Sequence, residues 1–126
     1  TWLVLAKPRV SVSTAWAYQN FRNEDVTARP NITAMKTAIK SSDKQGIIAC
    51  MGNVLESVTC KAYAEIDAIK EIMLANGAEI SLMSGSGPTV FCFVDSEDRG
   101  KHIAAVLREN FAIDIEVTKT LRRNDL

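Results

Sequence analysis

The residues that first point to chemistry are a run of small side chains, SGSGP at positions 84–88, between two segments of sheet-forming residues. Such residues leave the backbone amides of Gly85, Ser86 and Gly87 sterically open, and consecutive amides in a turn form a concave nest that binds an anion such as phosphate. The run does not match a Walker A loop, because it has neither the lysine of that motif nor a helix after it. The same residue types are common in plain hairpin turns. The run therefore has two interpretations, an anion-binding loop or a flexible hairpin.

Two neighbouring strands are expected to hold this run. Residues 79–83 alternate apolar and polar side chains, and residues 89–94 are apolar on both faces, as in a central strand covered by helices. A further buried strand is predicted over residues 2–6, ended near Pro8 because proline cannot donate to a sheet. Residues 113–121 alternate as a strand with one buried face.

Helices are expected to cover these strands. The segments predicted from three- and four-residue apolar spacing are 14–21 with Thr14 as N-cap, 32–41, a long block at 47–76 that Gly52 breaks and Gly77 ends, and a helix capped by Ser96. Strands that flank helices in this order predict an α+β fold, a ferredoxin-like two-layer sandwich of helices on a mainly antiparallel sheet.

Length and charge restrict the classes of partner. A chain of 126 residues with 47% apolar residues predicts one globular domain. Fifteen basic side chains balance fifteen acidic ones, so there is no excess of positive charge to bind nucleic acid or an anionic membrane. No apolar run approaches the roughly 18 residues of a membrane span, and no signal peptide is recognisable. We therefore expect a cytoplasmic protein without nucleic-acid or membrane partners.

The cysteines and the histidine do not form a catalytic or metal-binding set. Cys50, Cys60 and Cys92 have no CxxC spacing and lie in apolar patterns, which favours buried free thiols over disulfides or a zinc site. His102 is the only histidine and lies in a predicted amphipathic helix, so a Ser-His-Asp triad is disfavoured and a surface or core-edge position is expected. We therefore predict no metal ligands in this chain.

Three segments resemble the C-terminal domain of the GHMP family of small-molecule kinases. They are VLAKPRVSVSTAWAY at 4–18, GNVLE at 52–56 and GAEISLMSGSGPTVF at 77–91, in the order and spacing of that family. The third segment holds the glycine-rich loop that the family places between two strands. The first segment is similar to the branch of the family that acts on 4-diphosphocytidyl-2-C-methyl-D-erythritol.

The resemblance implies a kinase that uses ATP and Mg²⁺ to phosphorylate the 2-hydroxyl of this substrate, in the non-mevalonate route to isoprenoid precursors. It implies that Gly85, Ser86 and Gly87 lie near the phosphate groups, where their amides stabilise negative charge. Valine at either glycine is then expected to lower turnover more than stability, because the added branches block the approach of phosphate to the backbone.

The resemblance also implies a substrate pocket for the cytidine group. Thr14 and Ala15 fall where the family lines this pocket, and Tyr18 falls where an aromatic ring stacks on the cytosine. Packing of the Tyr18 ring on the core is an equally good explanation for that residue. Asn53 looks like a family signature position, and a helix N-cap explains it equally well.

One part of the family pattern is missing from this sequence. In the family, the ATP-binding loop P-x-x-x-G-L-[GS]-S-S-[AS] and the catalytic aspartate and lysine belong to an N-terminal domain, and no such loop occurs in residues 1–126. The resemblance therefore implies that these residues form a C-terminal domain, that ATP and Mg²⁺ bind mainly to the missing domain, and that the chain alone has little or no activity. No catalytic residue is assigned here.

Other functions remain open at this stage. Another GHMP kinase, of the homoserine or mevalonate type, would carry the same glycine-rich loop and act on a different alcohol. A binding module for a phosphorylated metabolite would use the loop without chemistry, since a fold does not determine function. A purely structural interaction domain would need no ligand at the loop.

Overall fold

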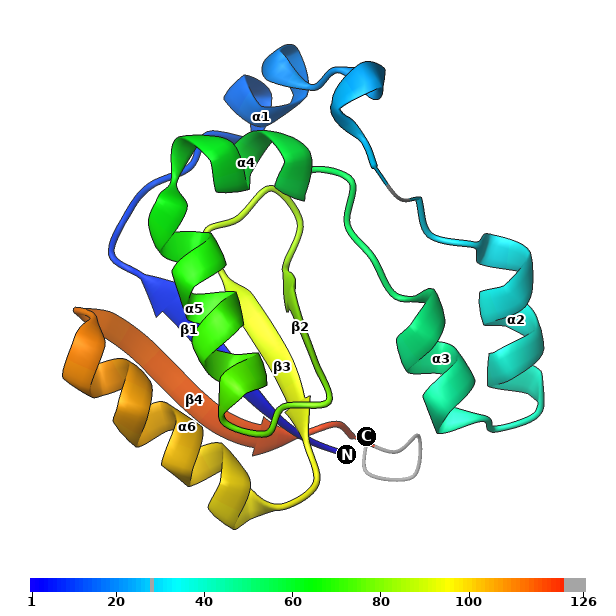
Figure 1. Cartoon of the computed structure of the whole chain (residues 1–126), viewed down its shortest axis with the longest axis vertical. Coiled ribbons are helices and arrows are strands. Elements are labelled where there is room, and N and C mark those ends of the chain that lie inside the picture. Colours follow the sequence, from blue (N-terminus) through cyan, green and yellow to red (C-terminus); the bar gives the residue numbers. More distant parts are fainter. Residues whose placement is uncertain (28, 122–126) are drawn as a thin grey trace.

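The computed structural model describes residues 1–27 and 29–121 as an antiparallel sheet with helices packed on it (Figure 1). The strands are β1 (Trp2–Pro8), β2 (Ile80–Met83), β3 (Val90–Val94) and β4 (Ile113–Lys119). Their order in the sheet is β2-β3-β1-β4, and each neighbouring pair is antiparallel. This is the strand order of a ferredoxin-like sandwich, so the predicted α+β fold is confirmed.

The helices form two groups. Helices α5 (Ala64–Ala75) and α6 (Glu97–Asn110) lie side by side on one face of the sheet, α5 over β2 and β3 and α6 over β1 and β4 (Figure 1). The remaining elements lie around one end and one side of this body: α1 (Thr14–Asn20), a short 3-10 turn (Asn23–Asp25), α2 (Ile32–Lys40), α3 (Lys44–Cys50) and α4 (Glu56–Ala62). Helices α2 and α3 pack against each other as a hairpin.

The core lies between the sheet and the helix pair. Alternate residues of β1 and β3 point at the helices, as the two-residue period of a strand requires. Core side chains that are essentially inaccessible to solvent are Val4, Val90, Cys92, Val94, Ile66, Ile69, Met73, Ile103 and Leu107. In the part of the chain that the structure describes, no helix is long and apolar enough to cross a membrane.

Two local predictions about α1 and β1 were wrong. The N-cap of α1 is Ser13, whose side chain accepts a hydrogen bond from the Trp16 amide, and Thr14 is the first helical residue. Strand β1 continues to Pro8, which lies opposite Ile113 of β4. Pro8 is tolerated because pairing with β3 stops at Ala6, so Pro8 has a neighbouring strand on one side only.

The helical block predicted over residues 47–76 is divided into three helices. The break at residues 51–55 confirms the one expected at Gly52, and a second break at Tyr63 was not predicted. The Tyr63 ring packs edge-on against Trp16 at a centroid distance of 5.8 Å, and its hydroxyl donates to the Ser11 carbonyl at 3.4 Å. These contacts with the segment around α1 accompany the non-helical backbone at Tyr63, with φ at −126° and ψ at 81°.

Candidate functional site

The glycine-rich run forms a tight loop between β2 and β3. The Ser84 amide donates to the Thr89 carbonyl at 2.8 Å, and the Gly87 amide donates to the Ser84 carbonyl at 3.0 Å. Gly85 and Gly87 both have positive φ, at 58° and 88°, and the Gly87–Pro88 peptide bond is cis. The loop is thus an ordered turn closed by its own backbone hydrogen bonds.

Two amides of this loop remain available for a ligand. Among the hydrogen bonds of the described residues, the N–H groups of Gly85 and Ser86 have no acceptor, whereas the Gly87 amide is used inside the turn. A Cβ atom at Gly85 would meet nothing within 4 Å. The open side of the loop therefore consists of Gly85 and Ser86, and the predicted anion nest has two free donors rather than three.

Gly87 lies on the opposite side of the loop, against the protein. A Cβ atom there would lie 2.9 Å from Met83 Sδ and 3.1 Å from Thr59 Cγ2. The expectation that valine lowers turnover more than stability therefore stays a prediction for Gly85. For Gly87 the geometry replaces it with an expected loss of stability, because both the positive φ and the close contacts oppose any side chain.

The predicted substrate residues of α1 lie beside this loop. Thr14 Oγ1 and Ser86 Oγ are 3.1 Å apart and share a hydrogen bond, although the two residues are separated by 72 positions in the sequence. Ala15 follows on an exposed position of the same helix. The fold thus brings the start of α1 and the glycine-rich loop together.

Tyr18 projects into solvent one helical turn after Thr14. Its side chain is 65% exposed, so packing on the core does not explain this residue. The contacts that hold α1 come from its other face, where Ala17 is buried and Trp16 packs against Tyr63. Tyr18 is therefore an exposed aromatic ring on a helix that is fixed by its neighbours.

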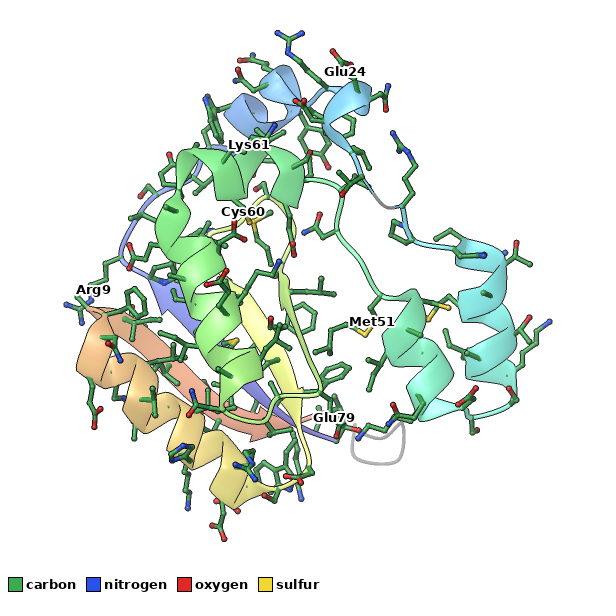
Figure 2. The ribbon with its side chains drawn as sticks, in the orientation of Figure 1. Arg9, Glu24, Met51, Cys60, Lys61 and Glu79 are labelled. Atoms are coloured by element: carbon green, nitrogen blue, oxygen red, sulfur yellow. The ribbon has the colours of Figure 1, made fainter. Side chains whose placement is uncertain are left out.

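Two hollows adjoin the loop and the Tyr18 ring. The first has a volume of about 360 Å³ and includes Tyr18 and Phe21 in its lining. The second has a volume of about 460 Å³ and includes Gly85 and Met51, which projects from the end of α3 towards the sheet (Figure 2). Both volumes are within the range of small-molecule sites. The two linings have three residues in common, Pro30, Gly52 and Asn53.

Asn53 is bonded to the glycine-rich loop. Its Nδ2 donates to the carbonyls of Met83 and Gly85 at 2.8 and 2.7 Å, and its Oδ1 accepts from the Leu55 amide at 3.0 Å. Leu55 directly precedes α4 and makes no capping bond, but the Asn53 side chain caps the turn at residues 54–55 that runs into this helix, so the N-cap explanation holds for that turn and accounts for only one of the Asn53 bonds. The bonds from Asn53 to the Met83 and Gly85 carbonyls were not predicted from the sequence.

Two further residues of α4 bind the same region and were not predicted. Thr59 is fully buried, and its Oγ1 donates to the Ser86 carbonyl at 2.9 Å. Glu56 Oε2 accepts from the Met83 amide at 2.8 Å, while its other carboxylate oxygen pairs with Lys70. The signal available in the sequence was a polar residue inside the apolar stretch Val58, Thr59, Cys60, which requires a buried partner.

The cysteines and the histidine have no reactive environment. Burial, with a further contribution from Asp67, raises the pKa of the Cys60 thiol to about 12, and burial raises that of Cys92 to about 11. Both thiols are free and stay protonated near neutral pH, which confirms them as core residues (Cys60 is labelled in Figure 2). Cys50 is also free, but it is only partly buried, so its predicted burial was wrong. His102 is exposed and bonds to Asn76 at 3.2 Å. Within the described residues, no group of three acidic, histidine or cysteine side chains is placed to hold a metal ion.

Comparison with known proteins gives the same family from sequence. The family model for the C-terminal region of GHMP kinases matches residues 35–113. The chain is 48% identical to a 4-diphosphocytidyl-2-C-methyl-D-erythritol kinase of Listeria innocua over 85% of this chain and 36% of the relative. It is 43% identical to a kinase of the same name from Exiguobacterium sibiricum over 98% of this chain and 42% of the relative. The chain thus spans less than half the length of these relatives.

Solved structures share the fold. A crystal structure of a 4-(cytidine 5'-diphospho)-2C-methyl-D-erythritol kinase aligns with a TM-score of 0.71 and 24% identity, covering 93% of this chain and 42% of the other. A homoserine kinase from Cytophaga hutchinsonii aligns with a TM-score of 0.75 and 18% identity, covering 94% and 41%. At these identities the alignments establish the shared fold alone.

Proposed function

The chain belongs to the GHMP kinase family, whose C-terminal domain it matches, and we propose that it forms this half of an ATP-dependent kinase. The proposed reaction is phosphorylation of the 2-hydroxyl of 4-diphosphocytidyl-2-C-methyl-D-erythritol in isoprenoid precursor synthesis, in the cytoplasm. Sequence identity of 43–48% to kinases of that name supports this substrate. Because the relatives are more than twice as long, we propose that a further domain supplies the rest of the enzyme.

The observation that carries the proposal is the position of the two free amides. The Gly85 and Ser86 amides have no acceptor among the described residues, and the Ser86 side chain shares a hydrogen bond with Thr14. Gly85 lines one hollow, and Tyr18 lines a second one that shares Pro30, Gly52 and Asn53 with the first. In the proposed enzyme these amides donate to phosphate oxygens, whose negative charge they stabilise as preorganised dipoles. Gly87 gives the turn its shape rather than an amide to the ligand.

In this proposal helix α1 recognises cytidine. Thr14 and Ala15 begin the helix beside the glycine-rich loop, and the exposed Tyr18 ring, one turn further on, is available to stack on the cytosine, with an offset or edge-on geometry of the kind that aromatic pairs prefer.

ATP and magnesium are assigned differently in this proposal. The loop amides fit the phosphate groups of a nucleotide or of the substrate. Among the described residues, no group of three or more acidic, histidine or cysteine side chains could hold Mg²⁺ by itself. We therefore propose that Mg²⁺, and most of the ATP, bind to the domain outside this chain, and we derive no catalytic step from them.

ADP release tests the proposal directly. The assay would use ATP, Mg²⁺ and 4-diphosphocytidyl-2-C-methyl-D-erythritol with this chain alone and with the chain joined to its upstream coding region. We expect turnover with the joined protein only. If neither form releases ADP with this substrate, and the joined protein does release ADP with homoserine or mevalonate, the substrate assignment is overturned.

A homoserine-type kinase is the second candidate, because the family match does not by itself determine which alcohol is phosphorylated. Competition by cytidine diphosphate separates the two. It should inhibit the diphosphocytidyl enzyme at the Tyr18 end of the site and leave a homoserine kinase unaffected. Saturable binding of a phosphorylated ligand without any turnover would instead favour a binding module.

A further inference from the structure

At the outer edge of β2, backbone groups form hydrogen bonds with side chains instead of with a neighbouring strand. Strand β2 is at the end of the sheet, so the peptide groups on its outer side have no strand to pair with. At Met83 the amide donates to the Glu56 carboxylate and the carbonyl accepts from Asn53. Two side chains from one short segment thus satisfy both peptide groups of the last residue before the glycine-rich loop.

The same segment continues along the loop. The Gly85 carbonyl accepts from the second N–H of the Asn53 amide, and the Ser86 carbonyl accepts from Thr59. The Ser84 carbonyl accepts from the Gly87 amide. Every carbonyl from Met83 to Ser86 therefore has a donor within the protein, while the Gly85 and Ser86 amides have no acceptor among the described residues.

This asymmetry determines which way the loop presents its polar groups. Anchored carbonyls cannot turn outward, where their negative ends would repel a phosphate, so the free N–H groups are what the loop offers to a ligand. Asn53 suits this role because its amide uses both donors and its oxygen at once. The opposite orientation of the amide would place its oxygen against two carbonyl oxygens, which the network excludes.

The anchoring segment is itself held in place. Glu56, which binds the Met83 amide, pairs with Lys70 of α5, and these side chains are only 17% and 19% exposed. Thr59 is fully buried on α4. The groups that bind the loop are therefore supported by the helix layer rather than by solvent-exposed side chains.

We infer that Asn53 and Thr59 are positioning residues, which hold the glycine-rich loop in the conformation that directs the Gly85 and Ser86 amides at a phosphate. Neither residue needs to touch the substrate for this role. The inference rests on the proposed kinase function for its effect on turnover, but its effect on the loop can be measured without any turnover.

Asn53→Asp is the decisive variant, tested in the protein that includes the upstream region. Aspartate keeps the size of the side chain and the acceptor for the Leu55 amide, but it loses both donors and places negative charge against two carbonyls. We expect kcat to fall about 100-fold, the scale expected for a misplaced catalytic group. Asn76→Asp is the matched control, because Asn76 donates to Ile72 at the far end of α5 and should leave kcat unchanged.

Thr59 allows a test with a conservative rescue. Thr59→Val removes the hydroxyl at nearly constant volume and leaves the Ser86 carbonyl unsatisfied, so we expect kcat to fall about tenfold. Thr59→Ser restores the donor and should restore most of the activity despite the small cavity it leaves. Equal activity of the valine and serine variants would contradict a role for this hydrogen bond.

Mass spectrometry can measure amide hydrogen exchange in the peptide that covers residues 83–89 of the same proteins. The exchange rate shows how well the loop is ordered, independently of turnover. We expect faster exchange in Asn53→Asp than in Asn76→Asp, at equal folded fractions by circular dichroism. Unchanged exchange overturns the inference, and so does faster exchange with unchanged kcat. If the wild-type protein has no kinase activity, the proposed function fails, and the exchange comparison still decides whether Asn53 orders the loop.

Discussion

The two sides of the glycine-rich loop differ in what surrounds them. Gly85 faces open space, and a Cβ atom there would meet nothing within 4 Å. Gly87 is only two residues away, but its missing side chain is what allows Met83, Thr59 and Ile66 to pack against the loop. Glycine at one position leaves room for a ligand, and glycine at the other leaves room for the protein. A glycine-rich motif therefore combines two separate requirements that substitutions can distinguish.

Gly87→Ala should have the largest effect on stability. The positive φ and the close contacts with Met83 and Thr59 together should lower the free energy of unfolding by about 3 kcal/mol. Urea unfolding of the chain, followed by circular dichroism, measures this change. A loss below about 1 kcal/mol would show that the packed side relaxes easily and would remove the contrast between the two glycines.

Gly85→Ala should affect stability less and activity more. Its φ of 58° costs alanine about 1 kcal/mol, and no contact opposes the added methyl group. In the protein that includes the upstream region, kcat/KM should fall about tenfold, because the methyl group occupies the side from which phosphate approaches the free amides. Unchanged kcat/KM with the expected stability loss would mean that the open side of the loop does not meet the ligand.

Tyr18→Ala should have the smallest effect on stability. The exposed side chain contributes less than about 0.5 kcal/mol to folding, but loss of stacking should raise KM for the diphosphocytidyl substrate about tenfold. Tyr18→Phe is the control, since phenylalanine keeps the aromatic face. If alanine and phenylalanine raise KM equally, the hydroxyl rather than the ring is important, and the stacking role is wrong.

Much of this arrangement was predictable because its signals are local. The strands around the glycine-rich loop, the helix that begins after Ser96 and the break near Gly52 follow from apolar periodicity and from glycine and capping residues. The segments that resemble GHMP kinases gave the family. Each of these signals lies within a few residues of the feature that it predicts.

The features that were missed depend on contacts between distant residues. Asn53 and Thr59 bond to carbonyls that lie 27 to 32 residues further along the chain, and no local pattern encodes such partners. The break at Tyr63 coincides with packing of its ring against Trp16, 47 positions earlier in the sequence. Even the N-cap of α1 was misplaced by one residue, because serine and threonine at positions 13 and 14 have similar capping ability.

The position of β1 has a consequence for how the chain folds. This strand precedes the other three in the sequence, yet it lies between β3 and β4, with Trp2 opposite both Val94 and Lys119. Bringing such distant segments together costs chain entropy before any contact compensates for it, and topologies of this kind fold slowly for their size. The local hairpin of β2 and β3 with α5 can form early, but the sheet is completed only when β1 pairs with β3 on one side and with β4 on the other.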